Sequence, residues 1–169
     1  MDLEVVWLGA IMHDVADHKF HGGDEEIGPQ KARELLTPLY AQERVDKVVD
    51  IVRYISFKGA KTQNRMNSLE GLIVQDADRL DAMGAIGIAR CFSYGGYKNR
   101  KMYDPSIPPV LHSSFEQYKS NQSTTLNHFY EKLLLLKDMM NTDSGRRMAE
   151  QRHKIMEDFV NTFKQEWAG

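Results

Sequence analysis

Apolar side chains recur at intervals of three and four residues in nearly every long segment of this chain of 169 residues. Such spacing places them on one face of an α-helix, and no segment has the strict alternation that is typical of a β-strand. We therefore expect an all-α fold, a bundle of about six helices in a single domain that comprises the whole of residues 1–169. The expected helices comprise residues 3–16, 24–39, 42–55, 68–92, 124–140 and 145–167.

The composition is that of an ordinary globular protein, with 41% hydrophobic and 27% charged residues. A formal net charge of −2 gives no overall attraction to nucleic acid or to an anionic membrane. Cys91 is the single cysteine and cannot form an internal disulfide, which favours a reducing compartment. The apolar run from Val5 to Met12 is too short to span a bilayer and follows acidic residues. We expect a cytoplasmic protein without a membrane or nucleic-acid polymer as partner.

The first expected helix is apolar on almost every side, a pattern that is typical of a helix buried by its neighbours. It begins almost at the first residue of the sequence, so no earlier helix is available in this sequence to cover it. Where that cover is missing, we expect an exposed apolar surface near Trp7, and such a surface favours homodimers.

An imidazole and a carboxylate stand side by side at the end of this apolar run, as His13 and Asp14. Imidazole nitrogen combined with carboxylate oxygen suits Mn, Fe, Zn, Co or Ni. Asp78, in a later helix, is the strongest candidate for an opposing carboxylate. It lies between Asp76 and Asp81, and three carboxylates this close repel one another unless a cation is near. Spacing by itself leaves a metal site and a salt-bridge network both open.

Two segments resemble motifs of the HD-domain phosphohydrolase superfamily. Residues 10–17, with Lys19 after them, resemble its HD motif, and residues 74–81 resemble its downstream aspartate motif. Other segments are similar to one branch of that superfamily, the bacterial and archaeal YedJ-like hydrolases. These segments comprise residues 20–25, 55–60, 84–90, 94–97, 128–133 and 163–169.

The resemblance implies a helical bundle around one divalent metal ion (Mn, Fe, Ni, Co, Zn or Mg), with His13, Asp14 and Asp78 as its ligands. It also implies hydrolysis of a phosphoester or phosphoanhydride in a small metabolite or nucleotide. Metal-dependent members carry one more histidine ligand on a helix before the HD motif, and no histidine precedes His13 here. We therefore expect an N-terminally short domain, in which His18 or His21 would have to substitute for that ligand.

The missing histidine leaves three hypotheses open. The first is an active metal-dependent phosphohydrolase. The second is a catalytically inactive HD-like domain that binds a nucleotide or a protein partner. The third is that an upstream helix with the histidine exists outside this sequence, which would restore the enzyme.

The resemblance and the spacing suggest roles for five more residues. We expect Asp17 to orient or deprotonate the attacking water, and a helix-capping carboxylate is the alternative. Lys19 and Lys58 are candidate phosphate contacts because an ammonium group binds phosphate as a compact charge, although most lysines are simply solvated. Arg79 and Asp81 are expected beside the ligands, where they would help to organise the carboxylates.

Overall fold

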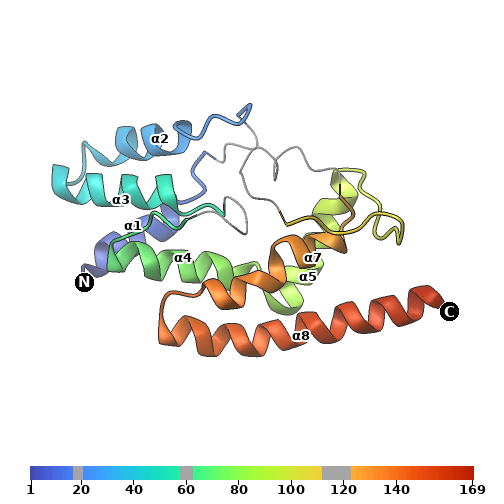
Figure 1. Cartoon of the computed structure of the whole chain (residues 1–169). Helices are drawn as coiled ribbons and strands as arrows, with labels where there is room; N and C mark the ends of the chain where they lie inside the picture. Colours follow the sequence, from blue (N-terminus) through green and yellow to red (C-terminus); the bar gives the residue numbers. More distant parts are fainter. Residues whose placement is uncertain (17–20, 58–62, 112–122) are drawn as a thin grey trace. The chain divides into compact units, whose positions relative to one another are not determined.

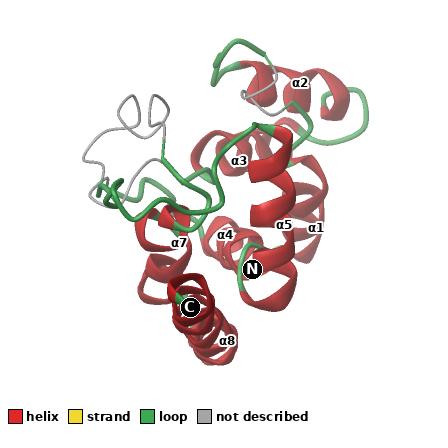
Figure 2. Cartoon of the chain, turned by 90° about the vertical axis from the view of Figure 1, so that its right-hand side faces the viewer, coloured by secondary structure: helices red, strands yellow, loops and turns green. Residues whose placement is uncertain are grey.

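The computed structural model describes residues 1–16, 21–57, 63–111 and 123–169. These residues contain seven α-helices and one 3-10 helix, and no strand occurs among them (Figures 1 and 2). The predicted all-α class is therefore confirmed. No helix in the described ranges is long and apolar enough to cross a membrane. The chain divides into two compact units, which consist of residues 1–57 with 64–78 and residues 58–63 with 79–169.

Helix α3 (Gln42–Tyr54) is the central element of the first unit and packs against α1 (Leu3–Met12) and α2 (Ile27–Leu36). Its buried side chains recur at three- and four-residue spacing, as predicted, and each contributes about 1.5–3 kcal/mol by leaving water. Helix α4 (Leu69–Asp81) adds Val74 to this core. The core residues of α3 are Val45, Val48, Val49, Ile51 and Val52.

Helix α1 buries only one of its two apolar faces. Val5 and Met12 belong to the core of the first unit. On the other side Leu3, Trp7 and Ile11, at four-residue intervals, are 62%, 69% and 69% exposed. The prediction of a helix buried on all sides was therefore wrong, whereas the expected exposed surface near Trp7 is confirmed. Apolar residues all round a helix show that it can be buried, but not which side its neighbours cover.

Because this surface is exposed, replacement of Trp7 by serine is expected to reduce the binding of a hydrophobic dye without loss of stability. A surface substitution of this kind changes the free energy of unfolding by about 0.5 kcal/mol or less. Val5→Ser, on the buried side of the same helix, serves as the control and is expected to cost at least about 2 kcal/mol. Dye fluorescence and thermal denaturation measure the two effects. A Trp7→Ser protein that melts as early as the Val5→Ser protein would contradict the exposed placement.

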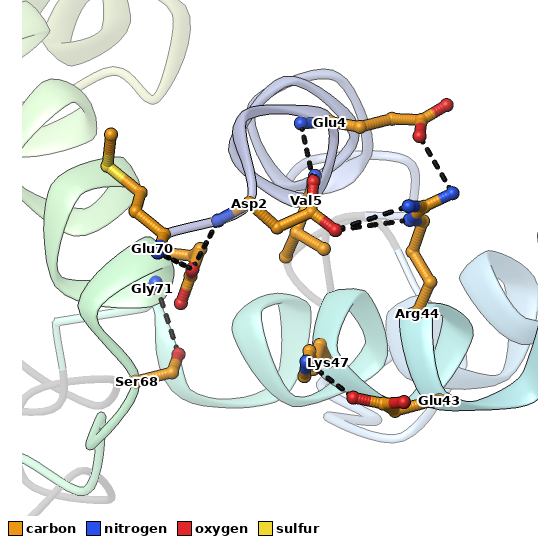
Figure 3. Close-up of polar contacts among 10 residues, drawn as sticks. Asp2, Glu4, Val5, Glu43, Arg44, Lys47, Ser68, Glu70 and Gly71 are labelled. Carbon is orange, nitrogen blue, oxygen red and sulfur yellow. Dashed lines mark hydrogen bonds and ion pairs between the residues drawn. The ribbon is translucent and has the colours of Figure 1, made fainter.

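A polar cluster fixes the N-terminal end of α1 within the first unit (Figure 3). The Asp2 carboxylate caps the helix by accepting hydrogen bonds from the backbone N–H groups of Glu4 (3.0 Å) and Val5 (3.4 Å). The guanidinium of Arg44, on α3, lies 3.2 Å from Asp2 and 2.7 Å from Glu4. The Asp2 N–H donates to Glu70 of α4 at 2.6 Å. These contacts set the axial position of α1, and with it the place where α1 ends.

The second unit contains α5 (Gly84–Tyr97), α7 (Asn127–Glu131), the 3-10 helix η2 (Leu133–Met139) and α8 (Asp143–Ala168). Helix α8 packs against both α5 and η2. The core includes a cluster of aromatic rings, in which the Phe92 ring centroid lies 5.6 Å from that of Phe159 and 6.1 Å from that of Phe129. The other large buried side chains include Leu80, Met83, Leu126, Leu133, Leu136, Met140, Met156 and Val160.

Two of the expected helices are each divided in the structure. The predicted helix over residues 68–92 was wrong, because Met83 is extended and Gly84 has a φ of +74°, which ends α4 before α5 begins. The predicted helix over residues 124–140 was also wrong. It is divided into α7 and η2 at Lys132, whose φ of −144° and ψ of −62° are not helical. Because of the first break, the three carboxylates of Asp76, Asp78 and Asp81 lie at the C-terminal end of α4.

The thiol of Cys91, on α5, is expected to react slowly. Burial raises its pKa from the ordinary 9.0 to about 11, and Sγ lies 3.8 Å from the Thr125 carbonyl oxygen. The thiolate is the reactive form, so this pKa lowers the reactive fraction at pH 8 about 100-fold. Alkylation by iodoacetamide is expected to be at least about 10-fold slower in the folded protein than in guanidinium, and to accelerate as pH rises towards 11. Equal rates in both states would contradict the half-buried placement of the thiol.

Candidate metal centre

His13 and Asp14 lie in the turn that follows α1, where the helix ends at Met12. His13 Nε2 is 3.3 Å from the Asp14 carboxylate and 3.8 Å from the Asp78 carboxylate of α4. The side chain of His13 is 27% exposed, and that of Asp78 is 39% exposed. The three residues predicted as ligands are therefore neighbours in the first unit, with the imidazole nitrogen facing two carboxylates.

The ring of His13 is held in one orientation by its own helix. Nδ1 lies 2.8 Å from the carbonyl oxygen of Ala10 and donates to it, which directs Nε2 towards the carboxylates. Metal-binding histidines typically make this second hydrogen bond to a carbonyl or carboxylate. The hydrogen bond with Asp14, with a smaller contribution from Asp78, raises the pKa of His13 from 6.5 to about 9. Positive charge is thus stabilised at Nε2, where a cation would lie.

The chemistry of these donors fits a divalent metal ion. Bonds of about 2.0–2.2 Å to N and O ligands hold two adjacent ligand atoms about 3.0–3.5 Å apart. The spacing of 3.3 Å between His13 and Asp14 is in this range, and the 3.8 Å to Asp78 requires a small side-chain rotation. In the positions that the structure describes, no group of three or more His, Cys, Asp and Glu side chains is close enough together to hold an ion. The residues are therefore suitable donors but not a closed cluster.

A pair of amide side chains, of which Gln75 is buried and Asn64 is exposed, fixes α4 just before Asp78. Gln75 is 2% exposed, and its Nε2 lies within 3.3–3.4 Å of the carbonyl oxygens of Tyr54 and Ile55, at the end of α3. Its Oε1 accepts a 2.8 Å hydrogen bond from the Asn64 side chain, which also accepts from Gln75. Asp78 follows Gln75 by three positions, about one helical turn. The pair therefore determines how α4 presents Asp78.

The importance of Gln75 was missed by the sequence analysis. A polar residue next to Val74 and one turn before a candidate ligand was the available signal. Gln75 is buried and uncharged, and in this it differs from the neighbouring aspartates, which carry charge.

The other predicted residues lie in different surroundings. Asp76 is 3% exposed. In the second unit Arg79 donates to the carbonyl oxygen of Met139, and the exposed Asp81 pairs with Arg90. These contacts support the end of η2 and the middle of α5, and the role of Arg79 and Asp81 as organisers of the carboxylates remains a prediction. His21 is exposed. The predictions for Asp17, Lys19 and Lys58 and the substitute ligand His18 lie outside the described residues.

Comparison with known families and relatives identifies one consistent relationship. The family model for the HD domain matches residues 1–83, which include His13, Asp14 and Asp78. The uncharacterized protein YpgQ of Bacillus subtilis is 36% identical over 177 residues, and the match covers 99% of this chain and 75% of YpgQ.

Solved structures support the same relationship. A Lactobacillus plantarum protein has a TM-score of 0.86 at 39% identity, covering 99% of this chain and 77% of that one. An HD-superfamily hydrolase from Bacillus thuringiensis has a TM-score of 0.69 at 44% identity, covering 98% and 74%. YpgQ in complex with ADP has a TM-score of 0.71 at 33% identity, covering 98% and 77%.

Proposed function

The chain belongs to the HD-domain superfamily of hydrolases, and we propose that it is a metal-dependent phosphohydrolase acting on a small phosphorylated compound, with a nucleotide as the first substrate to test. The observation that carries the proposal is the arrangement of His13 Nε2 against the carboxylates of Asp14 and Asp78, at 3.3 Å and 3.8 Å. The YpgQ complex with ADP supports a nucleotide as the substrate, because the similarity to YpgQ covers 98% of this chain.

In this proposal His13, Asp14 and Asp78 would hold one divalent ion. When bound, the ion would polarise a phosphoryl oxygen and lower the pKa of a water molecule. The residues of the chain do the positioning. Ala10 orients the imidazole, and the two carboxylates provide the negative charge that attracts the cation. Phosphoryl transfer depends mainly on such positioning and on neutralisation of charge.

Three further residues complete the proposed machinery. We propose that Asp17, which follows the HD dipeptide by one helical turn in sequence, orients or deprotonates the attacking water. Lys19 and Lys58 would contact the phosphate oxygens as point charges. Their sequence positions, next to the HD motif and after α3, are the basis for these assignments.

An inactive domain that binds a nucleotide without hydrolysis is the second candidate. The observation in its favour is that the described residues do not form a closed metal cluster. In that case the His13–Asp14 ion pair would be a structural contact at the end of α1, and metal affinity would be low.

The two candidates differ in metal content and turnover. The chain is reconstituted with Mn²⁺ or Ni²⁺, desalted and analysed for bound metal, and then assayed for phosphate or pyrophosphate release from ADP and ATP. The hydrolase predicts about one ion per chain and metal-dependent release. Less than roughly a tenth of an ion per chain together with no release would exclude the hydrolase for this chain. Absence of both metal and release would then favour the inactive domain.

A further inference from the structure

Positive charge accumulates at the C-terminal end of α5, where the described residues supply acidic partners for only some of the cations. No Asp or Glu occurs between Asp81 and Asp104 in the sequence, whereas this stretch contains four basic residues. The first and last of the four form ion pairs with these two acids. The middle two, Lys98 and Arg100, form no ion pair with an acid within the described part of the chain. Their charge is therefore available to an anionic ligand.

Two exposed tyrosine rings lie against these cations. Tyr94 is 39% exposed and Tyr97 is 71% exposed, and their ring centroids are 6.3 Å apart. Lys98 Nζ lies 5.1 Å from the Tyr97 centroid and 5.7 Å from the Tyr94 centroid. The guanidinium carbon of Arg100 is 5.8 Å from the Tyr94 centroid. We refer to Tyr94, Tyr97, Lys98 and Arg100 as the basic tyrosine patch.

The backbone that carries this patch is held in place. Asn99 has a φ of +53°, which ends α5, and the N–H of Arg100 returns to the Gly95 carbonyl at 2.9 Å. The next residue, Lys101, accepts a 2.9 Å hydrogen bond from the buried Thr125. Gly95 lies so close to Thr125 that a Cβ atom there would clash with its side chain. Less ordering is thus required of the backbone when a ligand binds.

We propose that the basic tyrosine patch binds a nucleotide unit, with its phosphate at Lys98 and Arg100 and its base stacked on the exposed ring of Tyr97. A base and an aromatic side chain stack through their flat faces, while lysine and arginine pair with phosphate oxygens. Lys98 and Arg100, which have no acidic partner among the residues that the structure describes, match the phosphate of such a ligand, and the two exposed rings match its base. The net charge of −2 gives the chain no general affinity for polyanions, so the attraction is local to this surface.

The nucleotide unit can belong to a free nucleotide or to single-stranded nucleic acid, and two probes separate these sources. ADP and a labelled oligothymidylate of about 12 nucleotides are titrated into the full chain in EDTA, by calorimetry and by fluorescence anisotropy. EDTA removes the contribution of metal at His13, Asp14 and Asp78. The metal-dependent part of the proposed hydrolase therefore does not contribute, and the response of the patch variants decides the proposal.

Three variants test the assignment of the residues. The double variant Lys98→Gln/Arg100→Gln and the single variant Tyr97→Ser are each expected to weaken binding at least about 5-fold. For the oligonucleotide, the slope of log K against log salt concentration is also expected to become less steep by about 1.4 in the double variant. Arg147→Gln/Lys154→Gln, on the exposed surface of α8, removes the same charge and is expected to change binding less than about 2-fold.

The source is identified by which probe responds. Loss of ADP affinity in the patch variants indicates a free nucleotide, and a response of the oligonucleotide without ADP binding indicates a single strand. The proposal is overturned if neither probe binds the wild type with a Kd below about 1 mM. It is also overturned if the α8 control weakens binding as much as the patch variant, or if Tyr97→Ser binds as the wild type does.

Discussion

Replacement of Asp78 by alanine is expected to weaken divalent metal binding at least about 100-fold, because even the loss of a residue that only supports a ligand costs 10–100-fold. Asp78 supplies the carboxylate that reaches His13 from α4, 3.8 Å from Nε2. Its side chain is 39% exposed, so the substitution leaves the core of the first unit intact. Titration of Mn²⁺ by calorimetry measures the loss, and the far-ultraviolet circular dichroism should remain unchanged.

Asp50→Ala is the matched control for this prediction. Asp50 is an exposed carboxylate on α3 in the same unit, and its contact to Arg53 is long, at 3.5 Å. The Asp50→Ala substitution removes the same charge at a position distant in sequence from the HD motif. Mn²⁺ affinity is therefore expected to stay within about 2-fold of the wild type. An unchanged Mn²⁺ affinity in Asp78→Ala protein would remove Asp78 from the proposed site.

Replacement of Gly87 by alanine is expected to destabilise the second unit by about 2–3 kcal/mol. A Cβ atom at Gly87 would lie against the carbonyl group of Ala82, closer than real Cβ contacts allow. The obstacle is backbone at the turn between α4 and α5, so the clash can be relieved only by shifting that turn. For a chain of this size we expect the melting temperature to fall by roughly 5–10 °C.

Gly96→Ala provides the comparison for this change on the same helix. No atom lies within 4 Å of a Cβ built at Gly96, and alanine favours the helix over glycine by up to about 1 kcal/mol. This variant is expected to melt at the wild-type temperature or slightly above it. If Gly87→Ala protein melts together with Gly96→Ala protein, the close approach at Ala82 is not present in solution.

The helices predicted best are those whose apolar residues occupy one face. The expected helix over residues 42–55 is observed as α3 (Gln42–Tyr54), and the one over 145–167 is observed as α8 (Asp143–Ala168). Periodicity did not predict two features of the fold. The apolar sequence of α1 did not indicate which of its sides the neighbouring helices cover, and the division of residues 68–92 depends on the φ of +74° at Gly84. Glycine adopts such an angle without cost but does not require it.

The candidate site was predictable only in part from the residues themselves. His13 and Asp14 are adjacent in sequence, but the arrival of Asp78 beside them depends on how α4 packs, which spacing along the chain does not determine. The resemblance to the HD motifs supplied that pairing, and the structure places the three side chains as neighbours. Gln75 was missed because a buried amide leaves no pattern of charge, and its partner Asn64 precedes it by 11 residues.

The amide pair of Asn64 and Gln75 makes the alignment of α4 insensitive to the solution around it. Neither side chain ionises, so acid does not weaken their hydrogen bonds, and dissolved ions do not screen them as they screen exposed charges such as Asp2 and Arg44. The end of α4 that carries Asp78 should therefore keep its place in concentrated salt, while the contacts at the start of α1 weaken. Changes in metal affinity with ionic strength would then report on the ion and its ligands, and not on movement of the helix beneath them.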